Sequence, residues 1–172
     1  MTPRKRSASR ILLLDDRDRL LLLCGRMSRL TGGCHWFTVG GGIDPGEDAV
    51  TAAVRELREE TALSVPAERL GPAVWTRRAA FIFEDRHYDQ DEEYRLLRLS
   101  AAEAAAVRVD PAEATHGHRW WTVAELAATD QAVYPERLAE LLPALLTTAP
   151  GQTPLHLGDF GFGPGYDLAP EA

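Results

Sequence analysis

The sequence contains few cysteines and no cysteine motif. Cys24 and Cys34 are the only two in 172 residues, and neither belongs to a C-x-x-C pair or a Cys/His cluster. A disulfide framework and a structural zinc site are therefore not expected. This sparse usage favours a reducing compartment, so we expect the protein in the cytoplasm.

The sequence also lacks a long apolar run. The first run, Ile11 to Leu14, ends at Asp15-Asp16 and is too short for a signal peptide. No later segment approaches the roughly 20 apolar residues that a membrane-spanning helix needs. We therefore expect no membrane partner.

Positive charge is in deficit. The chain has 19 Lys and Arg residues against 26 Asp and Glu residues, for a net charge of −7. A nucleic-acid backbone is then not the expected partner, because binding it requires a basic surface. The same balance repels a small anionic substrate unless a cation screens its charge.

The length and the remaining composition fit one globular domain. The 172 residues are 45% hydrophobic and 26% charged, which is enough to bury a core. We expect a domain over residues 1–148, with residues 1–7 as a loose basic arm. From residue 149 to residue 172 the composition shifts to glycine and proline with interspersed aromatics. We expect this tail to pack on the domain or on a partner subunit.

The segment from Gly40 to Leu63 carries most of the chemical signal. It starts as a glycine loop, turns at Asp44-Pro45-Gly46, and continues without a helix breaker from Ala49. Apolar residues at helical spacing predict a buried stripe, formed by Val50, Ala53, Val54 and Leu57. The adjacent face carries three acids, Glu56, Glu59 and Glu60.

The acidic face has two interpretations. Glu56 and Glu60 are four residues apart, so their carboxylates are neighbours that repel each other. A divalent cation would convert that repulsion into attraction, and Mg²⁺ selects hard oxygen ligands. The alternative is a solvated helix face. The buried stripe beside these acids and the glycine loop at the helix start, where backbone amides can meet an anion, favour a metal site.

The spacing of this segment resembles the Nudix box, Gly-x5-Glu-x7-Arg-Glu-apolar-x-Glu-Glu-x-Gly-apolar. The matching residues are Gly41, Glu47, Arg55, Glu56, Leu57, Glu59, Glu60 and Leu63. Ala62 stands where the family has glycine. Glycine has no side chain to take part in chemistry, so this difference concerns the backbone at the helix end and leaves the acids in place.

The resemblance implies a fold and an activity. The expected fold is of the α/β class: an α/β/α sandwich around a mixed β-sheet, with a loop-helix-loop catalytic motif. The expected activity is metal-dependent cleavage of a nucleoside diphosphate linked to another group, by attack of water on phosphorus. A small nucleotide-type molecule is then the partner, and a homodimer is possible.

The resemblance also implies site residues. Glu56, Glu59 and Glu60 would hold Mg²⁺ or Mn²⁺, and Glu56 and Glu59 are also catalytic candidates. Arg55 would pin a glutamate, while Gly41, Gly42 and Glu47 would shape the substrate side. Relatives often draw one further acid from the loop before a tryptophan strand, and Glu113 is the candidate here.

Around the box, sequence patterns predict alternating strands and short helices. The expected strands are residues 11–14, 20–23, 36–39, 73–77, 79–84, 92–99 and 119–123, with an acidic hairpin tip at 85–91. The expected helices are residues 101–107, a short capped helix at 124–126 and residues 135–146. The last helix packs on the core or faces a dimer partner.

Two other functions remain open at this point. One is a Nudix-like binding or regulatory module without catalysis, although such proteins generally lose box acids and this chain keeps them all. The other is a prenyl-diphosphate isomerase, which needs a cysteine, and Cys34 lies near the glycine loop. The identity of the nucleotide-type substrate does not follow from the box.

Overall fold

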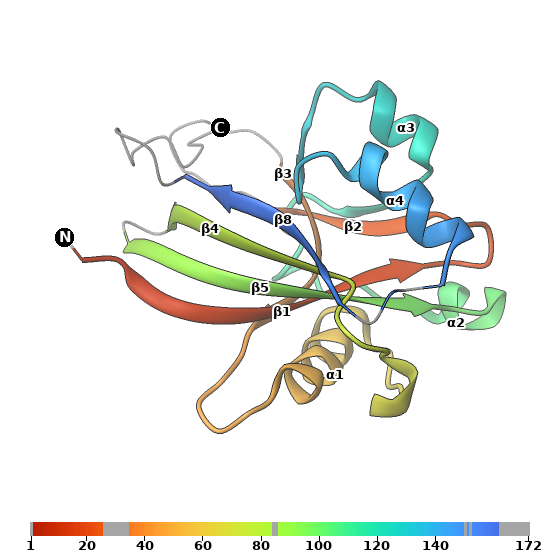
Figure 1. Cartoon of the computed structure of the whole chain (residues 1–172). Helices are drawn as coiled ribbons and strands as arrows, with labels where there is room; N and C mark the ends of the chain where they lie inside the picture. Colours follow the sequence, from red (N-terminus) through yellow and green to blue (C-terminus); the bar gives the residue numbers. More distant parts are fainter. Residues whose placement is uncertain (1, 26–34, 84–85, 150, 152, 162–172) are drawn as a thin grey trace.

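The computed structural model describes residues 2–25, 35–83, 86–149, 151 and 153–161. A mixed eight-stranded sheet forms its centre, in the order β6-β2-β3-β1-β5-β4-β8, with β7 paired to β3 (Figure 1). The strands are β1 (Arg4–Leu14), β2 (Leu20–Gly25), β3 (His35–Gly42), β4 (Trp75–Phe83), β5 (Arg86–Arg98), β6 (His118–Trp121), β7 (Ala132–Tyr134) and β8 (Leu155–Phe160). The helices are α1 (Ala49–Thr61), α2 (Ala101–Ala106), α3 (Val123–Ala128) and α4 (Leu138–Thr147), with a short 3-10 helix η1 (Ala67–Arg69).

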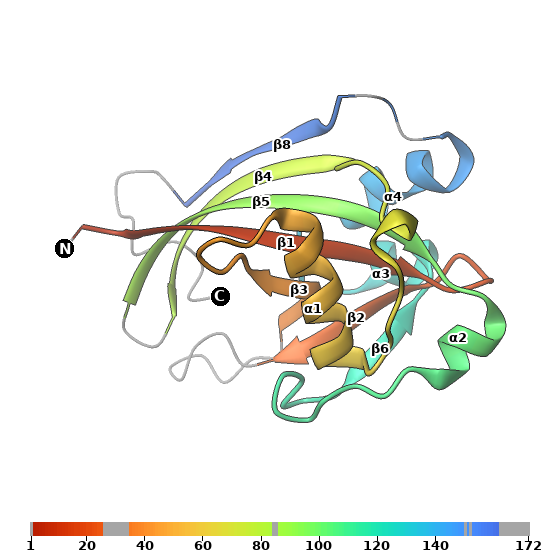
Figure 2. The same cartoon turned by 90° about the horizontal axis from the view of Figure 1, so that it is seen from below.

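Helices cover both faces of the sheet. Helix α1 lies across one face, and α3 and α4 lie on the other (Figures 1 and 2). Each face has its own core: Ile11 and Leu13 of β1 pack towards Leu57 of α1, whereas Leu12 and Leu14 pack with Leu138 of α4. Alternate residues of one strand thus feed two cores. The expected α/β sandwich around a mixed sheet is confirmed.

Strand β1 is the centre of the sheet. It pairs antiparallel with β3 and parallel with β5, whose register runs from Arg4 opposite Tyr88 to Leu14 opposite Arg98. The expectation of a loose arm over residues 1–7 is therefore wrong for residues 4–7. These polar residues give no strand pattern by themselves, and it is the pairing with a distant strand that extends them.

The β4–β5 hairpin also differs from its expected form. The two expected strands, 73–77 and 79–84, are one continuous strand, and most of the expected acidic tip at 85–91 belongs to β5. Cross-strand ion pairs account for the polar residues within the hairpin. Arg77 pairs with Glu92 at 2.8 Å, and Arg78 pairs with Asp89 at 2.7 Å.

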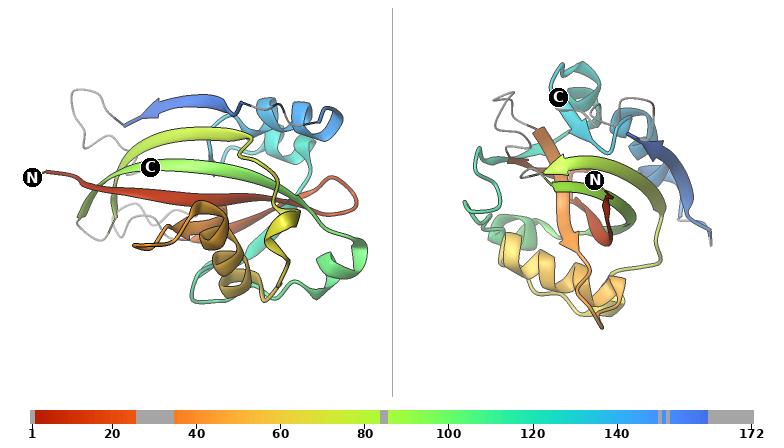
Figure 3. Two further views of the ribbon diagram at one scale, coloured as in Figure 1. Left: turned by 60° about the horizontal axis from the view of Figure 1, so that its bottom comes forward. Right: turned by 90° about the vertical axis from the view of Figure 1, so that its left-hand side faces the viewer.

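The C-terminal segment continues the sheet. Strand β8 pairs in parallel with β4 and follows it in all views (Figure 3). Of the aromatics expected to anchor the tail, Phe160 lies at the end of β8, while Phe162 and Tyr166 lie outside the described residues. The part of the tail that the structure describes thus belongs to the same sheet as the domain.

Three smaller features complete the fold. Helix α4 starts at Leu138, after a cis peptide bond between Tyr134 and Pro135, and buries Leu138 and Leu142 against the core as expected. Cys24 is disulfide-bonded, which differs from the expectation that the chain carries no disulfide framework. In the described part of the chain, no helix is long and apolar enough to cross a membrane.

Candidate active site

The three loop glycines end β3, where Gly40, Gly41 and Gly42 pair with Arg10, Ser9 and Ala8 of β1. Gly40 has a φ of 126°, and a Cβ atom there would lie 2.2 Å from the carbonyl oxygen of Ser9 on β1. Only glycine fits such a backbone at such a distance. The N–H of Gly40 is directed to Glu60, and its carbonyl oxygen accepts a hydrogen bond from Arg10.

The next two glycines differ in what surrounds them. A Cβ atom at Gly41 would lie 2.7 to 2.8 Å from the carboxylate atoms of Glu56, whereas a Cβ atom at Gly42 would meet nothing within 4 Å. The absence of a side chain at Gly41 therefore makes room for the Glu56 carboxylate. Gly42 contributes its carbonyl oxygen, which accepts a 2.9 Å hydrogen bond from Arg55.

Helix α1 is fixed at its start by two polar contacts. Asp48 caps it by accepting a 2.7 Å hydrogen bond from the backbone N–H of Thr51. Ser9 of β1 donates a 2.6 Å hydrogen bond to the carbonyl oxygen of Ala49. On the sheet side of α1, Ala52, Ala53 and Leu57 are fully buried. Burial and capping together set the rotation of the helix about its axis, and so the direction of its acids.

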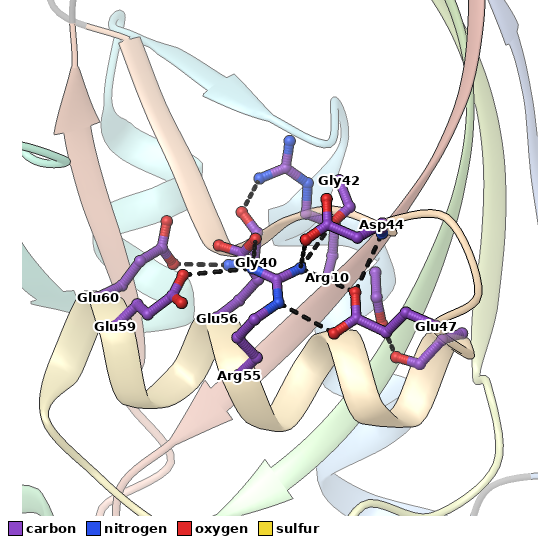
Figure 4. A network of polar contacts seen from close by, with 11 residues as sticks. Arg10, Gly40, Gly42, Asp44, Glu47, Arg55, Glu56, Glu59 and Glu60 are labelled. Atoms are coloured by element: carbon purple, nitrogen blue, oxygen red, sulfur yellow. Dashed lines mark hydrogen bonds and ion pairs between the residues drawn. The ribbon is translucent and has the colours of Figure 1, made fainter.

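Arg55 lies at the centre of the acids (Figure 4). It donates two hydrogen bonds of 2.9 Å to Glu47, one of 2.7 Å to Glu56 and one of 3.2 Å to Glu59. The bond from Arg55 to Glu47 raises the pKa of the guanidinium and lowers the pKa of the carboxyl. The expectation that Arg55 pins a glutamate describes this arrangement.

Glu47 contacts both the helix and the loop before it. One of its oxygens also accepts a 3.0 Å hydrogen bond from the backbone N–H of Asp44. The carboxylate therefore ties the turn before α1 to Arg55 on the helix. This geometry makes Glu47 a brace for the loop and does not bring it forward as a substrate contact.

Glu60 is the most deeply buried acid of the box. Its side chain accepts a 2.7 Å hydrogen bond from the backbone N–H of Gly40, and the residue is 3% exposed. Burial raises the pKa of Glu60 to about 8, although the Gly40 bond opposes the shift. Burial also raises the pKa of Glu56. Glu59, with a side chain 51% exposed, is the acid open to solvent.

The C-terminal end of α1 keeps the backbone that the family glycine would supply. Ala62 adopts the left-handed conformation at φ 62°, and its N–H bonds the carbonyl oxygen of Arg58. The replacement therefore leaves a local strain of about 1 kcal/mol, the ordinary cost of a non-glycine residue in this region.

Glu113 sits on a loop that is docked against the same helix end. The N–H of Arg108 bonds the carbonyl of Thr61 at 2.9 Å, and the N–H of Asp110 bonds the carbonyl of Glu60 at 2.9 Å. Glu113 is exposed, and its charge is close enough to raise the pKa of Glu60. The structure thus brings the loop acid to the side of the box acids.

The donor set fits a hard divalent cation by its chemistry. Glu56, Glu59 and Glu60 present carboxylate oxygens on adjacent turns, and a divalent cation held among them would offset the cost of placing negative charges side by side. In the conformation described, Arg55 takes one oxygen each of Glu56 and Glu59. Among the described residues, no three His, Cys, Asp or Glu side chains are already arranged around one point.

Sequence analysis missed Arg10, which lies behind the loop. Arg10 of β1 donates a 2.6 Å hydrogen bond to the carbonyl oxygen of Gly40, and its Nε lies 3.6 Å from Glu92. Arg10 shares one face of β1 with the apolar residues Leu12 and Leu14. A charged residue on that otherwise apolar face was the signal that the sequence offered. His116 precedes the edge strand β6 and His118 is its first residue, and both are exposed.

The comparisons with known proteins agree with this geometry. A family model described as NUDIX domain matches residues 4–144, and no curated protein is a significant match. A MutT protein from Methanosarcina mazei has 15% identity and a TM-score of 0.61, covering 83% of this chain and 94% of its own. The NUDIX domain of Shewanella oneidensis NrtR, complexed with ADP ribose, has 19% identity and a TM-score of 0.61. The match covers 85% of this chain and 91% of that domain's chain.

A third similar structure is an Ap4A hydrolase from C. elegans, described as a binary complex. It has 21% identity and a TM-score of 0.51, covering 70% of this chain and 82% of its own. At such identities these likenesses show the fold. The family model spans most of the chain, and the chain therefore belongs to the Nudix domain family. With the family comes the enzyme class, a hydrolase of phosphoric anhydride bonds.

Proposed function

We propose that this protein is a divalent-cation-dependent pyrophosphohydrolase that cleaves the diphosphate bridge of a nucleoside diphosphate linked to another group. The observation that carries the proposal is the complete set of box acids held around Arg55 and the Gly40 peptide. A deeply buried carboxylate next to further carboxylates is costly to the fold. A functional role for these acids, such as binding a cation, explains why they are buried together despite this cost.

Glu56, Glu59 and Glu60 are the proposed ligands of Mg²⁺ or Mn²⁺. A bound divalent cation would screen the diphosphate and lower the pKa of a water molecule. The protein residues supply the remaining requirements. Gly40 orients Glu60 through a 2.7 Å hydrogen bond, and Gly41 leaves space for Glu56.

Proton transfer is assigned to an exposed carboxylate. Glu59 is half exposed and is held only by one 3.2 Å bond from Arg55, and Glu113 is exposed on the docked loop. Either can accept a proton from the attacking water, because each reaches solvent beside the box. Glu56 is the third candidate, with one oxygen engaged by a 2.7 Å hydrogen bond from Arg55.

Arg55 and the loop are assigned to positioning. Arg55 holds the acids of the box at fixed separations, and Glu47 braces the turn. The backbone at Gly41 and Gly42 faces the open side of the loop, where no atom lies within 4 Å of the position a Gly42 side chain would take. This is the place we assign to the anionic part of the substrate.

The wider assignments belong to the same proposal. The NrtR domain binds ADP ribose, and the C. elegans structure is of an Ap4A hydrolase. These ligands suggest a nucleotide-type substrate here, in the cytoplasm, with a homodimer as the form to test. The isomerase alternative rests on Cys34, which lies outside the described residues.

A panel of substrates tests the proposal. Release of phosphate-containing products is measured with Mg²⁺ and then Mn²⁺, from nucleoside triphosphates, nucleotide sugars, ADP-ribose and dinucleoside polyphosphates. Turnover of one class that collapses in Glu60→Gln, but persists in the control Glu93→Gln, is the expected result. Tight binding of a panel compound without turnover would instead favour the regulatory module.

A further inference from the structure

Glu92 lies on the sheet face opposite α1 and is almost fully enclosed. It is 5% exposed and accepts hydrogen bonds from Tyr94 at 2.6 Å, Gln90 at 2.6 Å and Arg77 at 2.8 Å. A buried carboxylate with so many donors is fixed in orientation. Its charge is balanced from β4 by Arg77 and from β1 by Arg10.

Arg10 joins Glu92 to the glycine loop. Its Nη1 donates to the carbonyl oxygen of Gly40 at 2.6 Å and approaches that of Thr38 at 3.5 Å. Its Nε lies 3.6 Å from Oε1 of Glu92. One guanidinium thus spans three strands, from β5 through β1 to β3, on the face away from the box helix.

The Gly40 peptide is the point where the two faces of the sheet meet. Its carbonyl is held by Arg10 on one face, and its N–H is directed to Glu60 on the other. Gly40 has a φ of 126°, a backbone conformation that favours glycine. A change in the orientation of the Arg10 side chain therefore alters how firmly Gly40 is held, and with it the hydrogen bond from the Gly40 N–H to Glu60.

We infer that Glu92 is a positioning residue, which fixes Arg10 and, through the Gly40 peptide, the orientation of the Glu60 carboxylate. Arginine has a long side chain with several rotatable bonds, and both carbonyls that Arg10 approaches, of Gly40 and Thr38, lie on the same strand β3. The fixed carboxylate on β5 supplies the second point. The inference rests on the proposed function in taking Glu60 as a working acid of the site.

Glu136 provides a matched control within the same network. It accepts a 2.9 Å hydrogen bond from Arg77, as Glu92 does, but it has no contact with Arg10. Glu136→Gln and Glu92→Gln each remove one carboxylate charge from Arg77. Only Glu92→Gln removes the carboxylate next to Arg10. A difference in Gly40 exchange between the two variants therefore reports the proposed role of Glu92 alone.

The test is hydrogen exchange of the Gly40 amide in metal-free protein. Selective ¹⁵N-glycine labelling gives at most 14 glycine signals, with Gly25 and Gly42 as internal references. Glu92→Gln should speed exchange at Gly40 by about tenfold, as expected for the loss of one charge-assisted hydrogen bond. Arg10→Lys keeps the positive charge without the guanidinium geometry and should give a similar change.

A double variant separates positioning from general support of the sheet. If Glu92 acts through Arg10, then Glu92→Gln combined with Arg10→Lys speeds Gly40 exchange no more than about twofold beyond the larger single effect. The inference is overturned if the double variant speeds Gly40 exchange by the product of the two single effects. It is also overturned if Glu92→Gln leaves the exchange rate of the Gly40 amide unchanged, or if Glu136→Gln raises that rate as much as Glu92→Gln does.

Folding and function have their own readouts. Should Glu92→Gln not fold, Glu92→Asp keeps the charge but withdraws it from Arg10 by one methylene. A smaller acceleration at Gly40 is then expected, and a wild-type rate there contradicts the inference. With a substrate in hand, Glu92→Gln should lower kcat with little change in KM. A silent substrate panel contradicts the proposed function alone, because the exchange experiment involves neither substrate nor metal.

Discussion

Alanine substitution of the three loop glycines should give three different outcomes. At Gly40, a Cβ atom would lie 2.2 Å from the Ser9 carbonyl oxygen and 2.8 Å from the Arg10 Cα, both of them backbone atoms of the central strand. Strain at a positive φ costs roughly 1–3 kcal/mol, and overpacking against rigid atoms adds about 1–3 kcal/mol. We therefore expect Gly40→Ala to lose about 4 kcal/mol of folding free energy.

Gly41 should behave differently, because its neighbour is a side chain. A Cβ atom there would lie 2.7 Å from the end of Glu56, which can rotate away, so the cost in folding should stay below about 2 kcal/mol. The loss of activity should be much larger than the loss of stability. Displacing one carboxylate by about 1 Å lowers turnover by roughly a hundredfold when geometry is critical.

Gly42 is the control of this series. No atom lies within 4 Å of its hypothetical Cβ, and its φ is not in the left-handed region. Gly42→Ala should therefore fold as the wild type does, or gain about 0.5 kcal/mol from the less flexible unfolded chain.

Thermal unfolding and turnover of all three variants are the assays. A loss of about 4 kcal/mol corresponds to a fall in Tm of roughly 8–16 °C for a chain of this size. If Gly40→Ala melts within 3 °C of the wild type, or if Gly41→Ala keeps full activity with a normal Tm, the described position of the loop over α1 is incorrect.

Three further predictions concern α1. Ala62→Gly should raise Tm by about 2–4 °C, because glycine relieves the left-handed strain at this residue, and calorimetry that shows a lower Tm would refute the strain. Arg55→Gln should lower turnover about a hundredfold through misplaced acids, while Arg58→Gln, exposed on the same helix, should not. Because burial raises the pKa of Glu60 from 4.5 to about 8, its contribution to stability is complete below pH 4.5 and is lost as the pH rises through 8. Metal-free Glu60→Gln should then melt above the wild type at pH 8 and near it at pH 5, and equal melting of the two at pH 8 would contradict the burial.

The sequence predicts the centre of the site well because the relevant signals are local. Helix α1 follows from its apolar spacing, and the positions of Glu56 and Glu60 on it follow from the helical repeat. The capping box of Thr122 and Glu125 at α3 is found as expected, since it too involves only neighbouring residues. Such features depend on a few adjacent residues, which is why a single sequence specifies them.

The parts that sequence analysis missed depend on contacts between distant segments. Arg4–Ser7 and Arg86–Asp91 look like polar loops until β1 and β5 pair with each other. Arg78 looks like a break between two strands, but Asp89 neutralises it from the neighbouring strand. No pattern within one segment shows that Arg10 meets the carbonyl of Gly40, thirty residues away.

The most direct test of the proposed hydrolysis is turnover in H₂¹⁸O, with product phosphates analysed by mass spectrometry. The account predicts one ¹⁸O atom in one of the two phosphate-containing products, a requirement for Mg²⁺ or Mn²⁺, and loss of the label in Glu60→Gln. Cleavage without ¹⁸O on phosphorus, or labelling that is as fast in Glu60→Gln as in the wild type, would contradict it.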